Sequence, residues 1–94
     1  MKLEFIDGCE MHAKHPDTFH IPSKSAKETL APGDYVKIGV KVSELGITDE
    51  RIWVKIDTID DNTLTGTWGN QPELFDAELG DPVTFEKRHI LSII

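Results

Sequence analysis

The sequence predicts an α+β protein that is mainly β, with a small bent antiparallel sheet or a partly open SH3-like barrel and one short helix. Apolar and polar side chains alternate in residues 51–59 and 63–68, which is the two-residue period of a strand with one buried face. Residues 35–42 alternate in the same way. Tight Gly-Asp and Asp-Asn turns separate these segments, as in small twisted sheets.

The two arms in residues 51–68 predict a β-hairpin around which the chain is organised. Asp60, Asp61 and Asn62 join the arms, and such side chains bond their own backbone and tolerate left-handed dihedral angles. Alternation places Ile52, Val54 and Ile56 on the buried face of the first arm, opposite Trp53, Lys55 and Asp57.

Length and composition bound the rest of the architecture. The chain has 94 residues, of which 38% are hydrophobic and 29% charged, a balance typical of a globular domain with one modest core. We expect a single folding unit over residues 1–94. Within it, residues 1–22 form an N-terminal strand or arm that packs on a small β-domain of residues 23–94.

The N-terminal part predicts little regular structure. Residues 2–6 read as a short strand or extended arm, and Asp7-Gly8 as a turn that ends it. Residues 11–22 contain two prolines and no period, so we expect an ordered coil anchored by Phe19 and Ile21. Ser23 or Ser25 then caps a helix of two turns at most, which ends at a Pro-Gly turn.

Further strands follow that turn. Residues 35–42 form a strand with Val36, Ile38, Val40 and Val42 inward and Tyr35 outward, and residues 43–50 form a polar loop. After the hairpin, residues 73–78 connect to a strand at residues 83–85 and tuck one apolar side chain under the sheet. The apolar tail at residues 90–94 closes the core.

The net charge of −7 and the pI of about 4.9 restrict the classes of partner. An acidic surface lacks a general attraction to phosphate backbones or anionic lipids, so we expect no direct nucleic-acid or membrane binding. The same field favours a basic protein partner, and the alternative is that the charge only keeps the domain soluble.

Cysteine, histidine and leader signals favour a cytoplasmic protein without a cofactor. The single Cys9 forms no internal disulfide, and the N-terminal segment lacks the apolar core of a signal peptide. His12, His15 and His20 stand at spacings that are not typical of a metal site, so we expect no bound metal. No sequence signature of a catalytic nucleophile or phosphate loop is present, and we expect no enzyme; catalysis through Cys9 or a histidine pair is the weakest alternative.

Seven residues are candidates for binding. Trp53 and Tyr35 are predicted on the outer sheet face, where Trp53 is either an exposed anchor or is covered by the arm. Asp57, Asp60 and Asp61 form an acidic hairpin edge that docks a basic partner or is simply solvated. For Asn70 and His89, ligand contacts compete with an Asx-type turn and with a backbone hydrogen bond that fixes the last strand.

The order of motifs resembles one known family. Thr18-Phe19-x-Ile21-Pro22-Ser23, Leu30-x-Pro32-Gly33-Asp34-x-Val36-Lys37, Glu50-Arg51-x-Trp53-Val54, Gly66, Asn70-x-Pro72, Gly80-Asp81-x-Val83-x-Phe85 and His89-Ile90 occur in sequence. Together they resemble the bacterial domain-of-unknown-function family twenty-three fourteen over nearly the whole chain from Thr18. Trp68 departs from the small aliphatic residue expected there. The resemblance implies an α+β fold with a bent sheet, and a likeness of some relatives to toxin-associated immunity proteins implies protein binding.

Two functions from different classes follow from these observations. The first is a non-enzymatic protein-binding module, an inhibitor or immunity-like protein that acts through Trp53, Tyr35 and the acidic hairpin edge. The second is a binder of a nucleotide or metabolite, with a pocket between the bent sheet and the arm around Phe19, and with Asn70 and His89 as polar contacts. The oligomeric state expected is a monomer, or a dimer formed through a sheet edge.

Overall fold

A long β-hairpin forms the centre of the molecule, as predicted. The computed structural model describes residues 3–41 and 49–94, in which β3 (Asp49–Asp60) pairs antiparallel with β4 (Thr63–Trp68). Asp61 lies in the turn with φ of 55°, the left-handed region that Asp tolerates better than most residues. β3 begins at Asp49, so the prediction of a loop through residue 50 is wrong for its last two residues. The predictions for Lys2, Val42 and residues 43–48 lie outside the described residues.

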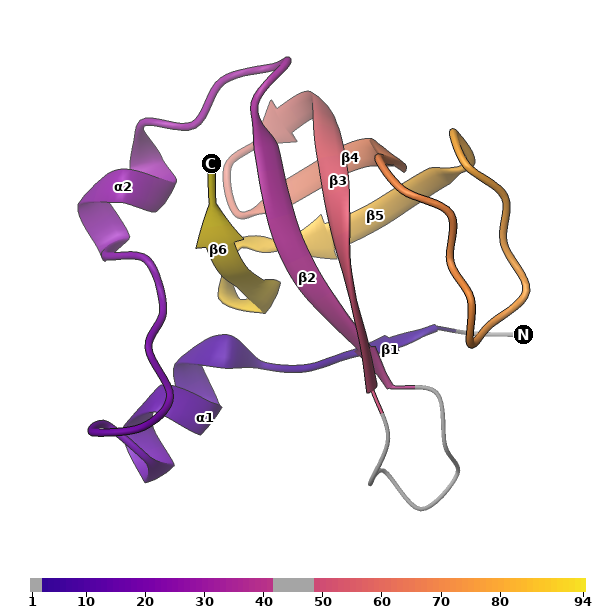
Figure 1. Cartoon of the computed structure of the whole chain (residues 1–94). Coiled ribbons are helices and arrows are strands. Elements are labelled where there is room, and N and C mark those ends of the chain that lie inside the picture. The colour runs from indigo at the N-terminus through magenta and orange to yellow at the C-terminus, as the bar shows by residue number, and fades with distance from the viewer. Residues whose placement is uncertain (1–2, 42–48) are drawn as a thin grey trace.

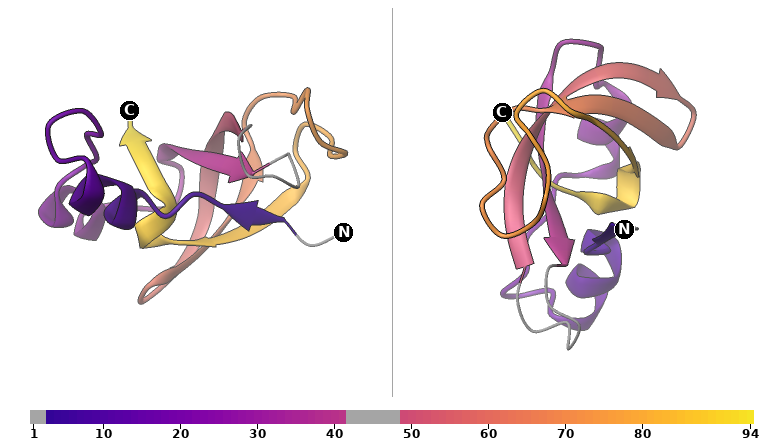
Figure 2. Two further views of the ribbon diagram at one scale, coloured as in Figure 1. Left: turned by 90° about the horizontal axis from the view of Figure 1, so that it is seen from below. Right: turned by 90° about the vertical axis from the view of Figure 1, so that its right-hand side faces the viewer.

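The other strands extend this hairpin into a curled antiparallel sheet. β2 (Tyr35–Lys41) pairs with β3, and β5 (Pro82–Glu86) pairs with β4. β1 (Glu4–Phe5) and β6 (Ile90–Ile93) both pair with β2, β1 near the end of that strand and β6 near its start. The sheet curls into a half-barrel, with β5 turned across β2 and β3 (Figures 1 and 2). The predicted fold class is confirmed.

The segment predicted as coil contains a helix, α1 (Gly8–Lys14), so that prediction is wrong for its first residues. Asp7 does not end a strand in a turn; its side chain accepts a hydrogen bond from the Glu10 N–H at 2.9 Å and caps the helix. Asp-Gly is both a turn signal and a helix start, and the short helix offers too few residues to show a helical period. Cys9 therefore lies on this helix.

The predicted helix is α2 (Lys24–Glu28), and it is confirmed. Of the two serines proposed as its cap, Ser23 performs this role, because its Oγ accepts a hydrogen bond from the Ala26 N–H at 3.1 Å. A 3-10 turn, η1 (Lys87–His89), joins β5 to β6.

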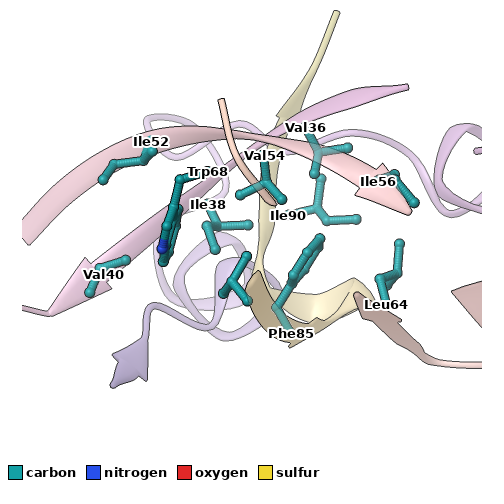
Figure 3. Packing of buried hydrophobic residues seen from close by; sticks show 11 residues of the cluster. Val36, Ile38, Val40, Ile52, Val54, Ile56, Leu64, Trp68, Phe85 and Ile90 are labelled. Carbon is teal, nitrogen blue, oxygen red and sulfur yellow. The ribbon is translucent and has the colours of Figure 1, made fainter. Parts of the chain in front are cut away.

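The core lies between β2 and β3 on one side and β4, β5 and β6 on the other, and their apolar side chains point toward one another (Figure 3). Among the described residues, every side chain of β2 and β3 that was predicted to point inward is buried. Phe75 is the apolar side chain tucked in from the connection after β4, with its ring 5.4 Å from that of Trp68. The buried cluster comprises Val36, Ile38, Val40, Ile52, Val54, Ile56, Leu64, Trp68, Val83, Phe85 and Ile90.

A β-bulge interrupts the hairpin and was not predicted. The register advances from Ile56 opposite Gly66 to Thr58 opposite Thr65, which leaves Asp57 as the extra residue. A side chain at Gly66 would collide with the carbonyl oxygen of Lys55, so only glycine allows β4 to approach β3 this closely.

Two similar turns dock onto the strand ends. Gly33 and Gly80 have φ of 96° and 87°, values that glycine adopts without strain. Asp34 and Asp81 each accept a hydrogen bond, at 2.9 Å, from the backbone N–H three residues earlier. The two Gly-Asp turns therefore share the same turn chemistry.

Candidate functional site

The outer surface of β2 and β3 brings together two aromatic and two basic side chains. The register places Tyr35 opposite Lys55 and Lys37 opposite Trp53, and all four alternate with residues buried in the core. They share the convex side of the half-barrel. We call Tyr35, Lys37, Trp53 and Lys55 the aromatic face.

Trp53 is only partly exposed on this face. Its side chain is half-buried, and the Nζ of Lys37 lies 4.6 Å from the ring centroid, a cation–π geometry. Tyr35 is 38% exposed and its ring lies over Gly69. The face therefore presents a large, partly fixed aromatic surface with a lysine on it.

The N-terminal segment covers a different part of the same sheet surface. Ile6 lies against Gly39, where a Cβ would come within 2.6 Å of it, and Leu91 of β6 lies beside the same position at 3.2 Å. Phe19 lies beside Arg51, whose guanidinium carbon is 5.7 Å from the ring centroid. Figure 1 shows both helices beside β2 and β3 rather than across the front of these strands.

Asn70 has a structural role next to the aromatic face. Its Oδ1 accepts a hydrogen bond from the Trp53 N–H at 2.9 Å, and the Gly69 N–H donates to the Trp53 carbonyl at 2.8 Å. Together these bonds continue the β3–β4 ladder beyond the last residue of β4. Asn70 thus holds the backbone of Trp53 in place, and its oxygen is committed to that bond.

Glu50 fixes the connection at residues 69–80, which the sequence did not indicate. Its half-buried carboxylate accepts from the Glu73 N–H at 2.9 and 3.1 Å and from the Leu74 N–H at 2.7 Å. Charged hydrogen bonds of this kind order a loop more strongly than neutral ones. Leu74 and Leu79 remain 55% and 61% exposed on this connection.

The acidic candidates lie at the opposite end of the hairpin from this connection. Asp57 is exposed at the bulge, and Asp60 and Asp61 are exposed at the turn. The residues paired with Trp53 and Tyr35 across β2 and β3 are lysines, not acidic residues. The single acidic, aromatic-bearing surface that the sequence predicted is therefore divided into a basic aromatic face and an acidic tip.

His89 is buried and anchors the start of β6. Its Nδ1 accepts a hydrogen bond from the Glu86 N–H at 3.0 Å, and its ring centroid lies 5.2 Å from that of Phe5. Burial lowers the pKa of His89, and the positive charge of Arg88 lowers it further. The structural alternative for this residue, a backbone hydrogen bond beside the last strand, is the one that the geometry supports.

Arg88 joins the two ends of the chain. Its Nη1 lies 3.2 Å from Asp7 and its Nη2 lies 3.1 Å from Glu86. Burial raises the pKa of the Asp7 carboxyl, but the Glu10 N–H and the Arg88 guanidinium outweigh this and hold the pKa below its usual value.

A hollow of about 560 Å³ lies between the sheet and the N-terminal arm, where the second functional hypothesis expects one. Phe19 and His89 line it, together with Arg51 and Arg88. Asn70 is bonded to β3 instead and is not among the residues that line this hollow. The predicted polar pair of Asn70 and His89 therefore does not converge on one site.

Within the described part of the chain, no group of three or more His, Cys, Asp or Glu side chains is placed to hold a metal ion. Likewise, none of the described helices has the length and apolar character needed to cross a bilayer.

Comparisons with known proteins found no matching family model, curated protein or solved structure. The resemblance to family twenty-three fourteen therefore stays a prediction.

Proposed function

We propose that the protein is a non-enzymatic protein-binding module, an inhibitor or immunity-like protein whose main contact surface is the aromatic face. The observation that carries this proposal is the placement of Trp53 and Tyr35 on the outer side of the sheet, where each faces a lysine across β2 and β3. Trp, Tyr and cationic side chains are typical anchors of protein interfaces.

Preorganisation of Trp53 also supports a binding role. The ring is held by Lys37, and its backbone is fixed on both sides by bonds to Gly69 and Asn70. A side chain that is already ordered loses less conformational freedom when a partner docks. The partly buried ring therefore offers contact area at low entropic cost.

The charge distribution defines the partner. The net charge of −7 attracts a basic protein at long range, and Asp60 and Asp61 are exposed at the tip to meet its cations. Lys37 and Lys55 require neutral or acidic groups where the partner meets Trp53. A partner that is basic overall, with an aromatic-accepting recess bordered by acidic side chains, fits both conditions.

Affinity capture followed by direct titration of the captured protein tests this role. We expect Trp53→Ala and Lys37→Glu each to weaken binding at least about tenfold, because they remove an anchor or reverse a central charge. Lys14→Glu is the matched control, since Lys14 is an exposed lysine on α1. Equal losses in the control, or binding unchanged by Trp53→Ala, would reject the aromatic face as the contact surface.

A further inference from the structure

A groove of about 470 Å³ lies between α2, the turn of the β3–β4 hairpin and η1. The chain as a whole is acidic, but this groove is rich in basic side chains. Four of the ten Lys and Arg residues of the chain line it. Ile21 and Pro22 supply an apolar wall. The basic side chains are Lys24, Lys27, Lys87 and Arg88.

Lys27 is the unusual member of this groove. It is only 6% exposed, and its Nζ has one hydrogen-bond acceptor among the described residues, the Sγ of Cys9 at 3.6 Å. An ammonium group has three N–H donors, and a thiol sulfur is a weak acceptor. The Lys27 ammonium therefore reaches the groove with N–H donors that no strong acceptor of the described residues satisfies.

The other cations of the groove differ in how they are neutralised. Arg88 pairs with Asp7 and Glu86, and the Nζ of Lys24 lies 3.9 Å from Glu28. Within the parts of the chain that are described, Lys27 and Lys87 have no carboxylate at ion-pair distance. Two such cations match the charge of a phosphate monoester, which carries about −1.5 to −2 at neutral pH.

We propose that this groove binds a small phosphorylated ligand, with its phosphate held by Lys27 and Lys87 and its body against Ile21 and Pro22. Lysine binds phosphate as a point charge, and its attraction is stronger at a site shielded from water. Glu28 and Asp61 also line this groove and oppose an anion there, although Glu28 lies 3.9 Å from the Nζ of Lys24. This site lies outside the aromatic face and does not depend on the protein-binding role.

Titration of the whole protein with inorganic phosphate and with phenyl phosphate, followed by NMR at constant ionic strength, tests the proposal. We expect saturable shifts of backbone amides around the groove, and tighter binding of phenyl phosphate because its ring reaches the apolar wall. Lys27→Met keeps the length of the side chain and should weaken binding at least about tenfold. The control Lys41→Met, at an exposed site outside the groove, should change it by less than about twofold.

Asp61→Asn gives a second readout that does not require removal of a buried residue. Asn tolerates the left-handed φ of this position, so the fold should be kept, and loss of the negative charge should tighten phosphate binding at least about twofold. Asp57→Asn, at the bulge, should leave the affinity unchanged. The proposal is overturned by shifts that do not saturate or that map elsewhere, by unchanged affinity in Lys27→Met, or, if that variant does not fold, by unchanged affinity in Asp61→Asn.

Discussion

Gly66→Ala is the substitution whose cost follows most directly from the structure. The added methyl group would lie 2.6 Å from Cγ1 of Val54 and would collide with the Lys55 carbonyl oxygen. Val is stiff at χ1, and the carbonyl belongs to the backbone beside the bulge, so neither neighbour can move aside cheaply. Overpacking costs about 1–3 kcal/mol, and two rigid neighbours place this case near about 3 kcal/mol.

Thermal and urea unfolding of the Gly66→Ala variant measure this cost. In a domain of this size each kcal/mol corresponds to about 4–8 °C, so the Tm should fall by at least about 12 °C. Gly69→Ala is the matched control, because its methyl group would meet atoms no closer than 3.2 Å, namely the Trp53 carbonyl oxygen and the ring of Tyr35. A loss in Gly66→Ala no larger than in the control would refute the close approach of β4 to β3.

Two further predictions concern the groups that fix the loop and the C-terminal strand. Glu50→Ala should lower the free energy of unfolding by about 1–3 kcal/mol and speed hydrogen exchange at the Glu73 and Leu74 amides. Exchange as slow as in the wild type would show that the carboxylate does not hold these two amides. The folded-state pKa of His89 lies below 6.5, so the unfolded state binds more protons and stability falls as the pH drops from about 7.5 to about 5.5. In the His89→Gln variant the free energy of unfolding should change less with pH over this range. An unchanged slope would show that other groups cause the pH dependence.

The strands were predictable because their signal is repeated and local. Alternation in β2 and β3 identified the buried face, and the Asp-Asn cluster identified the turn at Asp61. Both signals require only neighbouring residues. The cap of α2 at Ser23 was readable for the same reason, although the sequence left Ser25 as an equal choice.

The features that were missed depend on residues distant in sequence. The residues next to Asn70 do not show that its side chain accepts the hydrogen bond of the Trp53 N–H, as a strand carbonyl would. The residues next to Glu50 do not show that its carboxylate binds the amides 23 and 24 residues later. The lysine flanking of Trp53 required the register between β2 and β3, which alternation alone does not set. The burial of Lys27 likewise involves residues distant in sequence, because its Nζ contacts Cys9, 18 residues earlier.

The division of charge between the aromatic face and the hairpin tip changes how the sequence composition is interpreted. The average charge predicts attraction to basic molecules, but Lys37 and Lys55 border Trp53 and determine which groups a partner can place there. Long-range attraction and local contact therefore select for different properties of the same partner.

The most direct test of the central claim is NMR mapping of the protein in complex with the partner isolated by affinity capture. We predict that the indole N–H of Trp53 and the amides of Tyr35, Lys37 and Lys55 shift on binding, and that Trp53→Ala abolishes these shifts. Shifts confined to the groove around Lys27 or to the hairpin tip, with the Trp53 indole unaffected, would contradict the claim that the aromatic face is the binding surface.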